Sequence, residues 1–383
     1  MNKRHALLWR LLRPPVSIFL KLKFGYKATV AKHLPDHYIV VSNHVTDYDP
    51  LFVAMSFPRQ MYFVASEHIS RWGKLYSLLR WALEPILRPK GAVGAATVKT
   101  IFRKLREGGN VALFAEGVRS WDGVTSPIHP STVSLIRAAR CGLVTYRIEG
   151  GYFASPMWSS SKATRKGQVR GAPVGIYTKE QLAAMSDEEL ARLLQTDLHE
   201  DAYGRQQQSP VRFRGKSLAQ GLEYFLFVCP SCGAHASFCS HDDTVRCTCC
   251  SLQFTYDEYG YLHGAPFDTV RDFSRWQRER VDEDVVKESV YTAAAASLST
   301  VSKGQATRVD EGPLSLSPTT LTCGSTAFAL DRIPDMAMHG KHALVFSYQN
   351  EYYELIPDQS TNAIRFLLYF QSYQKQATKK IRS

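Results

Sequence analysis

The chain has 383 residues, which is enough for two or three domains. Hydrophobic residues make up 44% and charged residues 21% of the sequence, a balance that is typical of globular proteins and argues against a largely disordered chain. The formal net charge of +12 indicates a polyanionic partner, which leaves nucleic acid, an anionic membrane surface or a phosphorylated substrate as candidates.

Residues 1–24 are predicted to be an amphipathic segment that associates with a membrane. Apolar and basic residues alternate there at helical spacing, with a break expected at Pro14-Pro15. No uncharged run approaches the roughly 20 residues that span a bilayer, and Arg10 and Arg13 interrupt any apolar core of a cleaved signal peptide. We therefore expect an in-plane helix with Trp9 at the interface, in a peripheral or monotopic protein on the cytoplasmic face of an anionic membrane. The alternative is a helix that packs on the domain after it.

Residues 25–205 are predicted to form an α/β domain, because strand-like and helical runs alternate along them. Two capping boxes, which begin at Thr178 and Ser186, support the last helices. The strand-like runs are residues 38–41, 61–65, 111–114, 142–148 and 169–174, and the helical runs are 51–55, 72–81, 95–106, 130–139 and 178–198.

A polar turn follows the first apolar strand, at the edge where open α/β sheets place their ligands. It contains Asn43 and His44, and Asp49-Pro50 then predicts a helix start with Asp49 at the N-cap. On such a turn, the Asp49 carboxylate can bond one imidazole nitrogen of His44 and leave the other nitrogen to take a proton. Asp47 is a rival partner, and an N-capping Asp beside a surface His is the structural alternative.

A second polar turn follows the strand at residues 110–114. Glu116, Gly117, Arg119 and Ser120 gather there. An Arg side chain with a hydroxyl and loop N–H groups suits a phosphate, which a guanidinium binds through two hydrogen bonds.

Together, the two turns resemble the glycerolipid acyltransferase family, of which lysophosphatidic acid acyltransferase is the type member. Ala115 and Val118 depart from the Pro and Thr of the family's phosphate-binding motif, and Thr145 stands where a Pro is usual. The residues that match are Asn43, His44 and Asp49 in the first motif, Phe114, Glu116, Gly117, Arg119 and Ser120 in the second, and Arg88 between them.

The resemblance implies transfer of a fatty acyl group to a lysophospholipid hydroxyl, with acyl-CoA or acyl carrier protein as donor. The expected acceptor is the sn-2 hydroxyl of 1-acyl-sn-glycerol-3-phosphate, which gives phosphatidic acid in phospholipid biosynthesis. His44 would be the general base and Asp49 would orient it, without a catalytic cofactor. The expected acceptor-binding residues are Arg88, Glu116, Gly117, Arg119 and Ser120, the last of which either assists or caps the next segment.

Residues 223–264 are predicted to be a zinc ribbon, preceded by a surface linker at residues 206–222. Cys229 and Cys232 form one knuckle and Cys247 and Cys250 another, with 14 residues between the knuckles. Four thiolates at this spacing are typical of a closed, structural Zn²⁺ site. Cys249 is the alternative fourth ligand.

Residues 285–383 are predicted to form an all-β, barrel-like domain closed by a helix at residues 362–374. This order of elements resembles a pleckstrin-homology-like domain in topology alone, so it assigns no function. Two other functions remain alternatives for the chain: a nucleic-acid-binding protein, and a non-catalytic scaffold at a membrane. Nucleic acid is the less favoured partner because the basic residues are spread over the chain rather than gathered on the ribbon.

Overall fold

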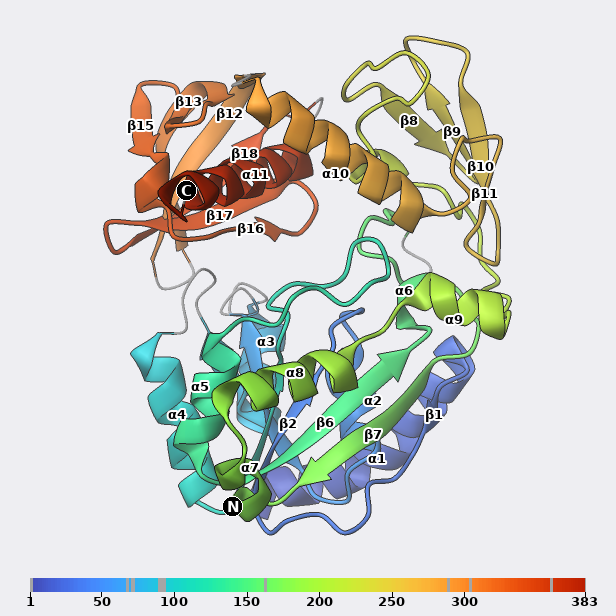
Figure 1. Cartoon of the computed structure of the whole chain (residues 1–383). Helices are drawn as coiled ribbons and strands as arrows, with labels where there is room; N and C mark the ends of the chain where they lie inside the picture. Colours follow the sequence, from blue (N-terminus) through green and yellow to red (C-terminus); the bar gives the residue numbers. More distant parts are fainter. Residues whose placement is uncertain are drawn as a thin grey trace. The chain divides into compact units, whose positions relative to one another are not determined.

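The computed structural model describes residues 3–66, 69, 73–88, 94–161, 164–287, 290–302, 305–358 and 361–382. The chain divides into two compact units (Figure 1). The first runs to Lys216 but leaves out Trp158–Ser161, and the second combines that short segment with the chain from Ser217 onward. Each unit is described by itself.

The first unit is built on a seven-stranded mixed sheet in the order β1-β7-β6-β2-β5-β3-β4. Strands β6, β2, β5, β3 and β4 run parallel, and β7 is antiparallel to β6. The strands are β1 (Lys27–Ala28), β2 (Tyr38–Ser42), β3 (Met61–Ser66), β4 (Ile86–Arg88), β5 (Asn110–Phe114), β6 (Gly142–Glu149) and β7 (Arg170–Tyr177). The helices are α1 (Lys3–Phe24), α2 (Asp49–Met55), α3 (Lys74–Leu83), α4 (Ala95–Arg106), α5 (Ser131–Ala139), α6 (Gly151–Ala154), α7 (Lys179–Ala184), α8 (Asp187–Leu198) and α9 (Ala202–Gln208). The predicted α/β fold is thus confirmed.

Alternate side chains of the central strand β2 point to opposite faces of the sheet. Ile39 and Val41 join a buried cluster with apolar residues of α4, α5, α7 and α8. Tyr38 faces the other way, where its ring stacks on Phe57 after α2. Because β2 is buried on both faces, its sequence is a continuous apolar run, as is usual for central parallel strands. Both predicted capping boxes form, at the starts of α7 and α8.

Helix α1 differs from the sequence-based expectation. It continues through Pro14 and Pro15 instead of breaking there. Trp9, expected at a membrane interface, is instead buried at 7% exposure, so that prediction is wrong. The inner face of α1 packs into the unit through buried Leu20 and Phe24, which explains why packing keeps the helix intact despite the prolines.

The outer face of α1 is also apolar. Leu7, Leu11, Ile18 and Leu22 recur along the helix, and each is more than half exposed. No helix among the described residues is both long and apolar enough to cross a bilayer.

The second unit contains two antiparallel sheets and two long helices. A four-stranded sheet has the order β11-β10-β9-β8, and a curled seven-stranded sheet has the order β15-β14-β13-β12-β18-β17-β16 (Figure 1). Its elements are a 3₁₀ turn (Leu222–Tyr224), β8 (Phe238–His241), β9 (Thr244–Cys247), β10 (Gln253–Tyr256), β11 (Leu262–His263), α10 (Val270–Val286), β12 (Tyr291–Ser302), β13 (Gln305–Leu316), β14 (Thr320–Cys323), β15 (Thr326–Ala329), a second 3₁₀ turn (Leu330–Arg332), β16 (Met336–His339), β17 (Ala343–Tyr348), β18 (Glu351–Pro357) and α11 (Ala363–Arg382). The predicted all-β domain with a closing helix is therefore present.

The predicted linker, residues 206–222, is mostly exposed between residues 207 and 217, as expected of a surface segment, and is fixed at a few points. Gln206 ends in α9 and exchanges two hydrogen bonds with the backbone of Val211. Phe213 is buried in the first unit, and Leu218 and Leu222 are buried in the second. The anchoring apolar residues are spaced through a polar, basic stretch without a helical or strand period, so the sequence predicted the surface position of the linker but not these contacts.

Candidate functional site

The polar turn after β2 brings His44 and Asp49 into contact. His44 Nδ1 and Asp49 Oδ2 are 2.7 Å apart. Asp49 is fully buried, and its carboxylate also accepts hydrogen bonds from the N–H groups of Val45 and Thr46 and from the Thr46 hydroxyl. This bond fixes the tautomer of the His44 imidazole and leaves its other ring nitrogen, Nε2, available to take a proton.

The structure distinguishes between the carboxylates considered as partners of His44. The Asp47 side chain is 80% exposed and lies 3.3 Å from the Arg119 guanidinium, whereas Asp49 contacts the imidazole. Asp49 was also expected to be the N-cap of α2, but Tyr48 holds that position and Asp49 is the first residue of the helix. The carboxylate is turned back because the donors of the preceding turn bind it, and it makes no cap for α2.

Two further contacts fix the turn to the sheet and orient His44. The Asn43 amide exchanges hydrogen bonds of 2.9 and 2.8 Å with the backbone of Ile148 in β6. The His44 ring stacks on Phe114, with 4.4 Å between ring centroids. Asn43 and Phe114 thus position the imidazole, a role that the motif match alone did not assign to either of them.

Glu116 joins the two polar turns. Its Oε1 accepts the backbone N–H of His44 at 2.7 Å, and its Oε2 accepts that of Ser126 at 2.6 Å. Burial raises the pKa of Glu116 to about 8, against the opposing effect of these two N–H donors. The sequence predicted an acceptor-binding role for Glu116, which stays a prediction; its contacts in the structure are those of a positioning residue.

The other predicted binding residues surround the same turn. The Arg88 guanidinium lies 3.9 Å from where a Cβ of Gly117 would be, so the end of β4 meets the second polar turn. Gly117 has a φ of +72°, a backbone conformation that glycine adopts without strain. The Arg119 side chain is 14% exposed. Ser120 is buried, and its hydroxyl accepts the N–H of Gly123, which corresponds to the capping alternative.

The four predicted zinc ligands also come together. The Sγ atoms of Cys229, Cys232, Cys247 and Cys250 all lie within 4.8 Å of one another. The Cys229–Cys250 and Cys232–Cys247 pairs are 3.7 and 3.8 Å apart. Tetrahedral Zn–S bonds of about 2.3 Å require sulfur atoms roughly 3.8 Å apart, so this donor set fits Zn²⁺.

The alternative ligand, Cys249, lies outside this cluster. It is exposed, and its backbone N–H donates to Cys247 Sγ at 3.4 Å.

Helix α10 supports the first knuckle, because buried Gln277 accepts the N–H groups of Phe227 and Val228, just before Cys229. With four protein ligands the site leaves no position for a substrate, so a bound metal there would be structural.

Metal removal is expected to unfold residues 225–262 locally. Chelation or Cys232→Ser should increase amide hydrogen exchange in β8–β10 while the sheet of the first unit keeps its protection, because the ribbon's knuckles depend on the metal. Cys249→Ser is the matched control and should leave exchange unchanged. Equal protection before and after chelation would contradict a structural metal.

The pKa of Glu116 predicts how stability depends on pH. An acid with a raised folded-state pKa is ionised first in the unfolded chain, so its contribution to stability is lost as pH rises from about 4.5 to about 8. Calorimetry should show this decline in the first unit of the wild type and a flatter profile in Glu116→Gln, which cannot ionise. Glu188→Gln removes an exposed carboxylate of α8 and should retain the wild-type slope. Parallel profiles for all three proteins would exclude the raised pKa.

The comparisons with known proteins give a family match and several similar structures. The sequence matches no curated protein. The 1-acyl-sn-glycerophosphate (LPA) acyltransferase PlsC from Thermotoga maritima is similar in structure, with a TM-score of 0.42, 19% identity and coverage of 56% of this chain and 86% of that chain. The N-terminal PH domain of human ARAP2 has a TM-score of 0.18 and 8% identity, covering 23% of this chain and 82% of that domain. A C-terminal domain of an unknown Leishmania infantum protein has a TM-score of 0.14 and 15% identity, covering 27% of this chain and 95% of that one.

A family model gives the more direct result. Residues 27–149 match the model described as Acyltransferase. This range includes the His44–Asp49 pair, Arg88 and the turn from Glu116 to Ser120. The chain therefore contains a domain of the Acyltransferase family, and that domain holds both polar turns.

Proposed function

We propose that the protein transfers a fatty acyl group from a thioester to the sn-2 hydroxyl of 1-acyl-sn-glycerol-3-phosphate, giving phosphatidic acid. The observation that carries the proposal is the 2.7 Å contact between His44 and buried Asp49, beside two arginines. Another lysophospholipid with a phosphate in its head group is the alternative acceptor, because Arg88 and Arg119 would bind the phosphate of either.

His44 acts as the general base in this mechanism. As the acceptor hydroxyl attacks the thioester carbonyl, its proton passes to Nε2 of His44, and Asp49 stabilises the imidazolium that forms. The tetrahedral intermediate then collapses, the C–S bond breaks, and the leaving thiolate takes the proton from His44. The acceptor oxygen is itself the nucleophile, so no acyl-enzyme intermediate is required.

The acceptor's phosphate is assigned to the second polar turn. Arg119 is held by exposed Asp47, a contact that a more highly charged phosphate can replace. Arg88 lies next to Gly117. A side chain at position 117 would narrow the path by which the phosphate reaches the backbone of this turn. Glu116 keeps this turn aligned with His44 through its two buried hydrogen bonds.

A lipid acceptor also gives the outer face of α1 a role. We propose that its exposed leucines enter the interface of an anionic membrane from the cytoplasmic side. Exposed Arg10 and exposed Lys21 lie on the same helix, and each basic residue near an anionic surface adds about 1 kcal/mol. Exposed Leu78 and Trp81 of α3, a helix that packs on α1, extend this surface.

Acyl transfer is tested with labelled acyl-CoA, labelled acyl carrier protein and a panel of lysophospholipids. We expect labelled phosphatidic acid with the wild type and a loss of about 10²–10⁴-fold in kcat for His44→Ala, because proton transfer by the base is removed. Asp49→Asn should also lose activity. Calorimetry of each variant checks that the fold is retained. Normal turnover by His44→Ala would refute the mechanism, and label in a different lipid would replace the acceptor.

Membrane association is tested by flotation with vesicles that contain an anionic phospholipid. The double variant Leu11→Glu/Ile18→Glu should bind at least about tenfold more weakly, since burying each such side chain is worth roughly 1.5–3 kcal/mol. Val286→Glu, which changes an exposed apolar residue of α10 in the second unit, is the control and should bind as the wild type does. Undiminished binding by the double variant would exclude α1 as the anchor.

A further inference from the structure

The loop between α6 and β7 leaves the first unit and returns to it. At its base, in the first unit, the N–H of Arg165 donates to the carbonyl oxygen of Ala154 at 2.9 Å. Its tip, Trp158–Ser161, belongs to the second unit. Residues 155–157 alone join α6 to the tip, and the ring of Pro156 restricts this stretch further. The position of the tip therefore constrains the end of α6.

The second unit buries the tip. Trp158 is fully buried, and its indole packs edge-on against the ring of Tyr256 in β10, with 5.4 Å between ring centroids and 81° between ring planes. The N–H of Ser160 donates to the carbonyl oxygen of Gln220 at 3.0 Å. A buried indole makes one of the largest apolar contacts available to a side chain, so Trp158 is the anchor of the tip.

The backbone of the tip is enclosed as closely as the indole. Gly221 has a φ of +101°, and a Cβ there would lie 2.3 Å from the carbonyl oxygen of Trp158 and 2.6 Å from the nitrogen of Ser160. Lys341, between β16 and β17, donates from Nζ to the carbonyl oxygen of Ser159. Four residues of the second unit thus form the dock of Trp158: Gln220, Gly221, Tyr256 and Lys341.

The β9–β10 hairpin connects this dock to the cysteine cluster. Cys247 and Cys250 lie at the turn of the hairpin. At the other end, the N–H of Tyr256 donates to the carbonyl oxygen of Asp243 at 2.9 Å. Strands this short need support from outside the hairpin, and a metal held by the four cysteines would provide it. The dock therefore depends on the same fold that the cysteines hold together.

In the first unit, α6 packs closely against loops of the candidate site. A Cβ on Gly151 would lie 2.5 Å from Val45, the residue after His44. The ring of Tyr152 lies 2.9 Å from where a Cβ of Gly123 would be, in the loop that continues from the second polar turn. A four-residue helix is too short to be stable by itself, so the position of α6 depends on these contacts and on the chain at its two ends.

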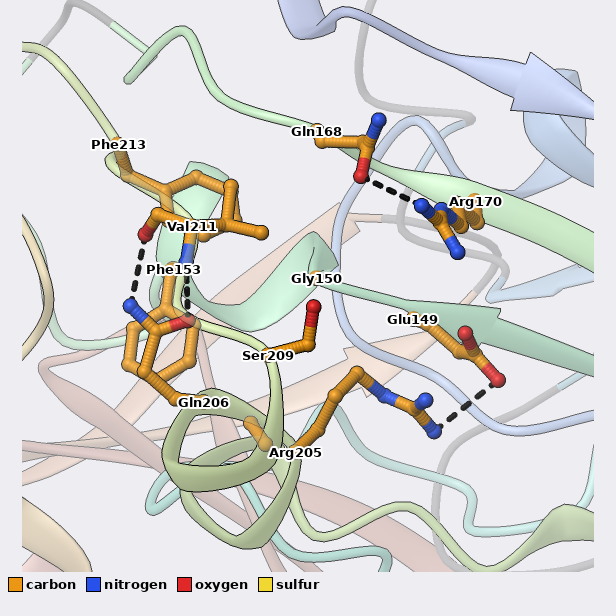
Figure 2. Close-up of a pocket in the computed structure, with 11 residues that line it drawn as sticks. Glu149, Gly150, Phe153, Gln168, Arg170, Arg205, Gln206, Ser209, Val211 and Phe213 are labelled. Carbon is orange, nitrogen blue, oxygen red and sulfur yellow. Dashed lines mark hydrogen bonds and ion pairs between the residues drawn. The ribbon is translucent and has the colours of Figure 1, made fainter.

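Another connection to the second unit is attached to α6 as well (Figure 2). The chain enters the second unit after Lys216. Just before this point Phe213 packs on Phe153 of α6, with 5.4 Å between ring centroids. Figure 2 also shows the hydrogen bonds between Gln206 and the backbone of Val211, which fix the start of this segment. Both connections therefore reach the first unit at α6.

The two connections are paired in one antiparallel register. In the first unit Lys166 and Arg214 exchange backbone hydrogen bonds of 2.8 and 2.9 Å. In the second unit Ser160 pairs with Gln220, and the same number of residues separates the two pairs on each segment. Paired segments are stiffer than two separate linkers, so movement at the dock is transmitted rather than absorbed.

We propose that Trp158 is a positioning residue for acyl transfer. Docked in the second unit, it holds α6 against the turn that carries His44. The inference rests on the proposed function, and it gives the ribbon a part in catalysis without a substrate site of its own. Loss of the dock releases the end of α6, and the imidazole of His44 then occupies its productive position for a smaller fraction of the time.

Hydrogen exchange on the full chain tests the proposal without turnover. Trp158→Ala should make exchange at least about tenfold faster in residues 151–155 and 43–49, while strands β2 and β5 keep their protection. Trp158→Phe retains a ring beside Tyr256 and should restore most of the protection. Trp276→Ala removes an indole of α10 elsewhere in the second unit, so it is the matched control and should leave both segments unchanged.

A second variant disturbs the dock and leaves Trp158 in place. Gly221→Ala directs a Cβ into the backbone of the tip and should reproduce the effect of Trp158→Ala. Gly73→Ala is its control, because Gly73 also has a positive φ, of +58°, but has no atom within 4 Å of its added Cβ. Chelation should speed exchange in α6 of the wild type and add little in Trp158→Ala, since two changes that act through one contact are not additive.

Each outcome decides the proposal. Wild-type exchange at residues 151–155 and 43–49 in both Trp158→Ala and Gly221→Ala would overturn it. Equal acceleration by Trp276→Ala would overturn it too, since that would show general loosening of the second unit. With turnover, Trp158→Ala should lower kcat about tenfold or more and change the acceptor KM less, whereas an unchanged kcat would refute the positioning role. Accelerated exchange in a protein without acyl transfer to any lysophospholipid would refute the proposed function and leave Trp158 assigned to holding α6.

Discussion

The candidate site depends on one buried carboxyl group, that of Glu116. It spans two loops that follow different strands, because its two oxygens accept the N–H groups of His44 and Ser126. A buried acceptor that lost either donor would carry an uncompensated desolvation cost, so the two loops are held in one arrangement. The buried side chain of Asp49 then fixes the imidazole of His44 relative to its own turn. The distance between His44 and the turn that contains Arg119 therefore follows from buried hydrogen bonds rather than from the lengths of flexible loops.

The sequence predicted the elements of this site better than their contacts. Apolar, β-branched runs that end in polar residues are sufficient to place His44 and Glu116 at strand ends, because such a short apolar run is the usual sequence of a buried parallel strand. The partner of Glu116 could not be predicted, since Ser126 lies ten residues further along in a loop without a period. For Asp49 the sequence predicted the contact with His44, with Asp47 as the rival partner. The structure shows that contact, and only the expected N-cap position is wrong, because Tyr48 holds it.

Segments with two apolar faces were the hardest to predict. Helix α1 has one face buried in the first unit and another exposed, and hydropathy alone does not say which face contains Trp9. Its continuation through Pro14 and Pro15 depends on that packing, which local propensity cannot include. The metal-ligand cysteines, by contrast, could be predicted from the sequence, because tetrahedral coordination of a metal restricts their spacing along the chain. Cys250 rather than Cys249 completes the cluster, as the regular knuckle spacing predicted.

The sheet also explains why contacts from distant parts of the chain meet at His44. A parallel sheet gathers the carboxyl ends of its strands along one edge, and β2 lies in the middle of this sheet. The turn that follows β2 is therefore flanked by the turn that follows β5 and by β6. Glu116 contacts it from the β5 side, and the backbone of Ile148 in β6 binds Asn43 on the other side. Because both contacts are buried hydrogen bonds, a change at the end of either neighbouring strand can displace the imidazole without touching it.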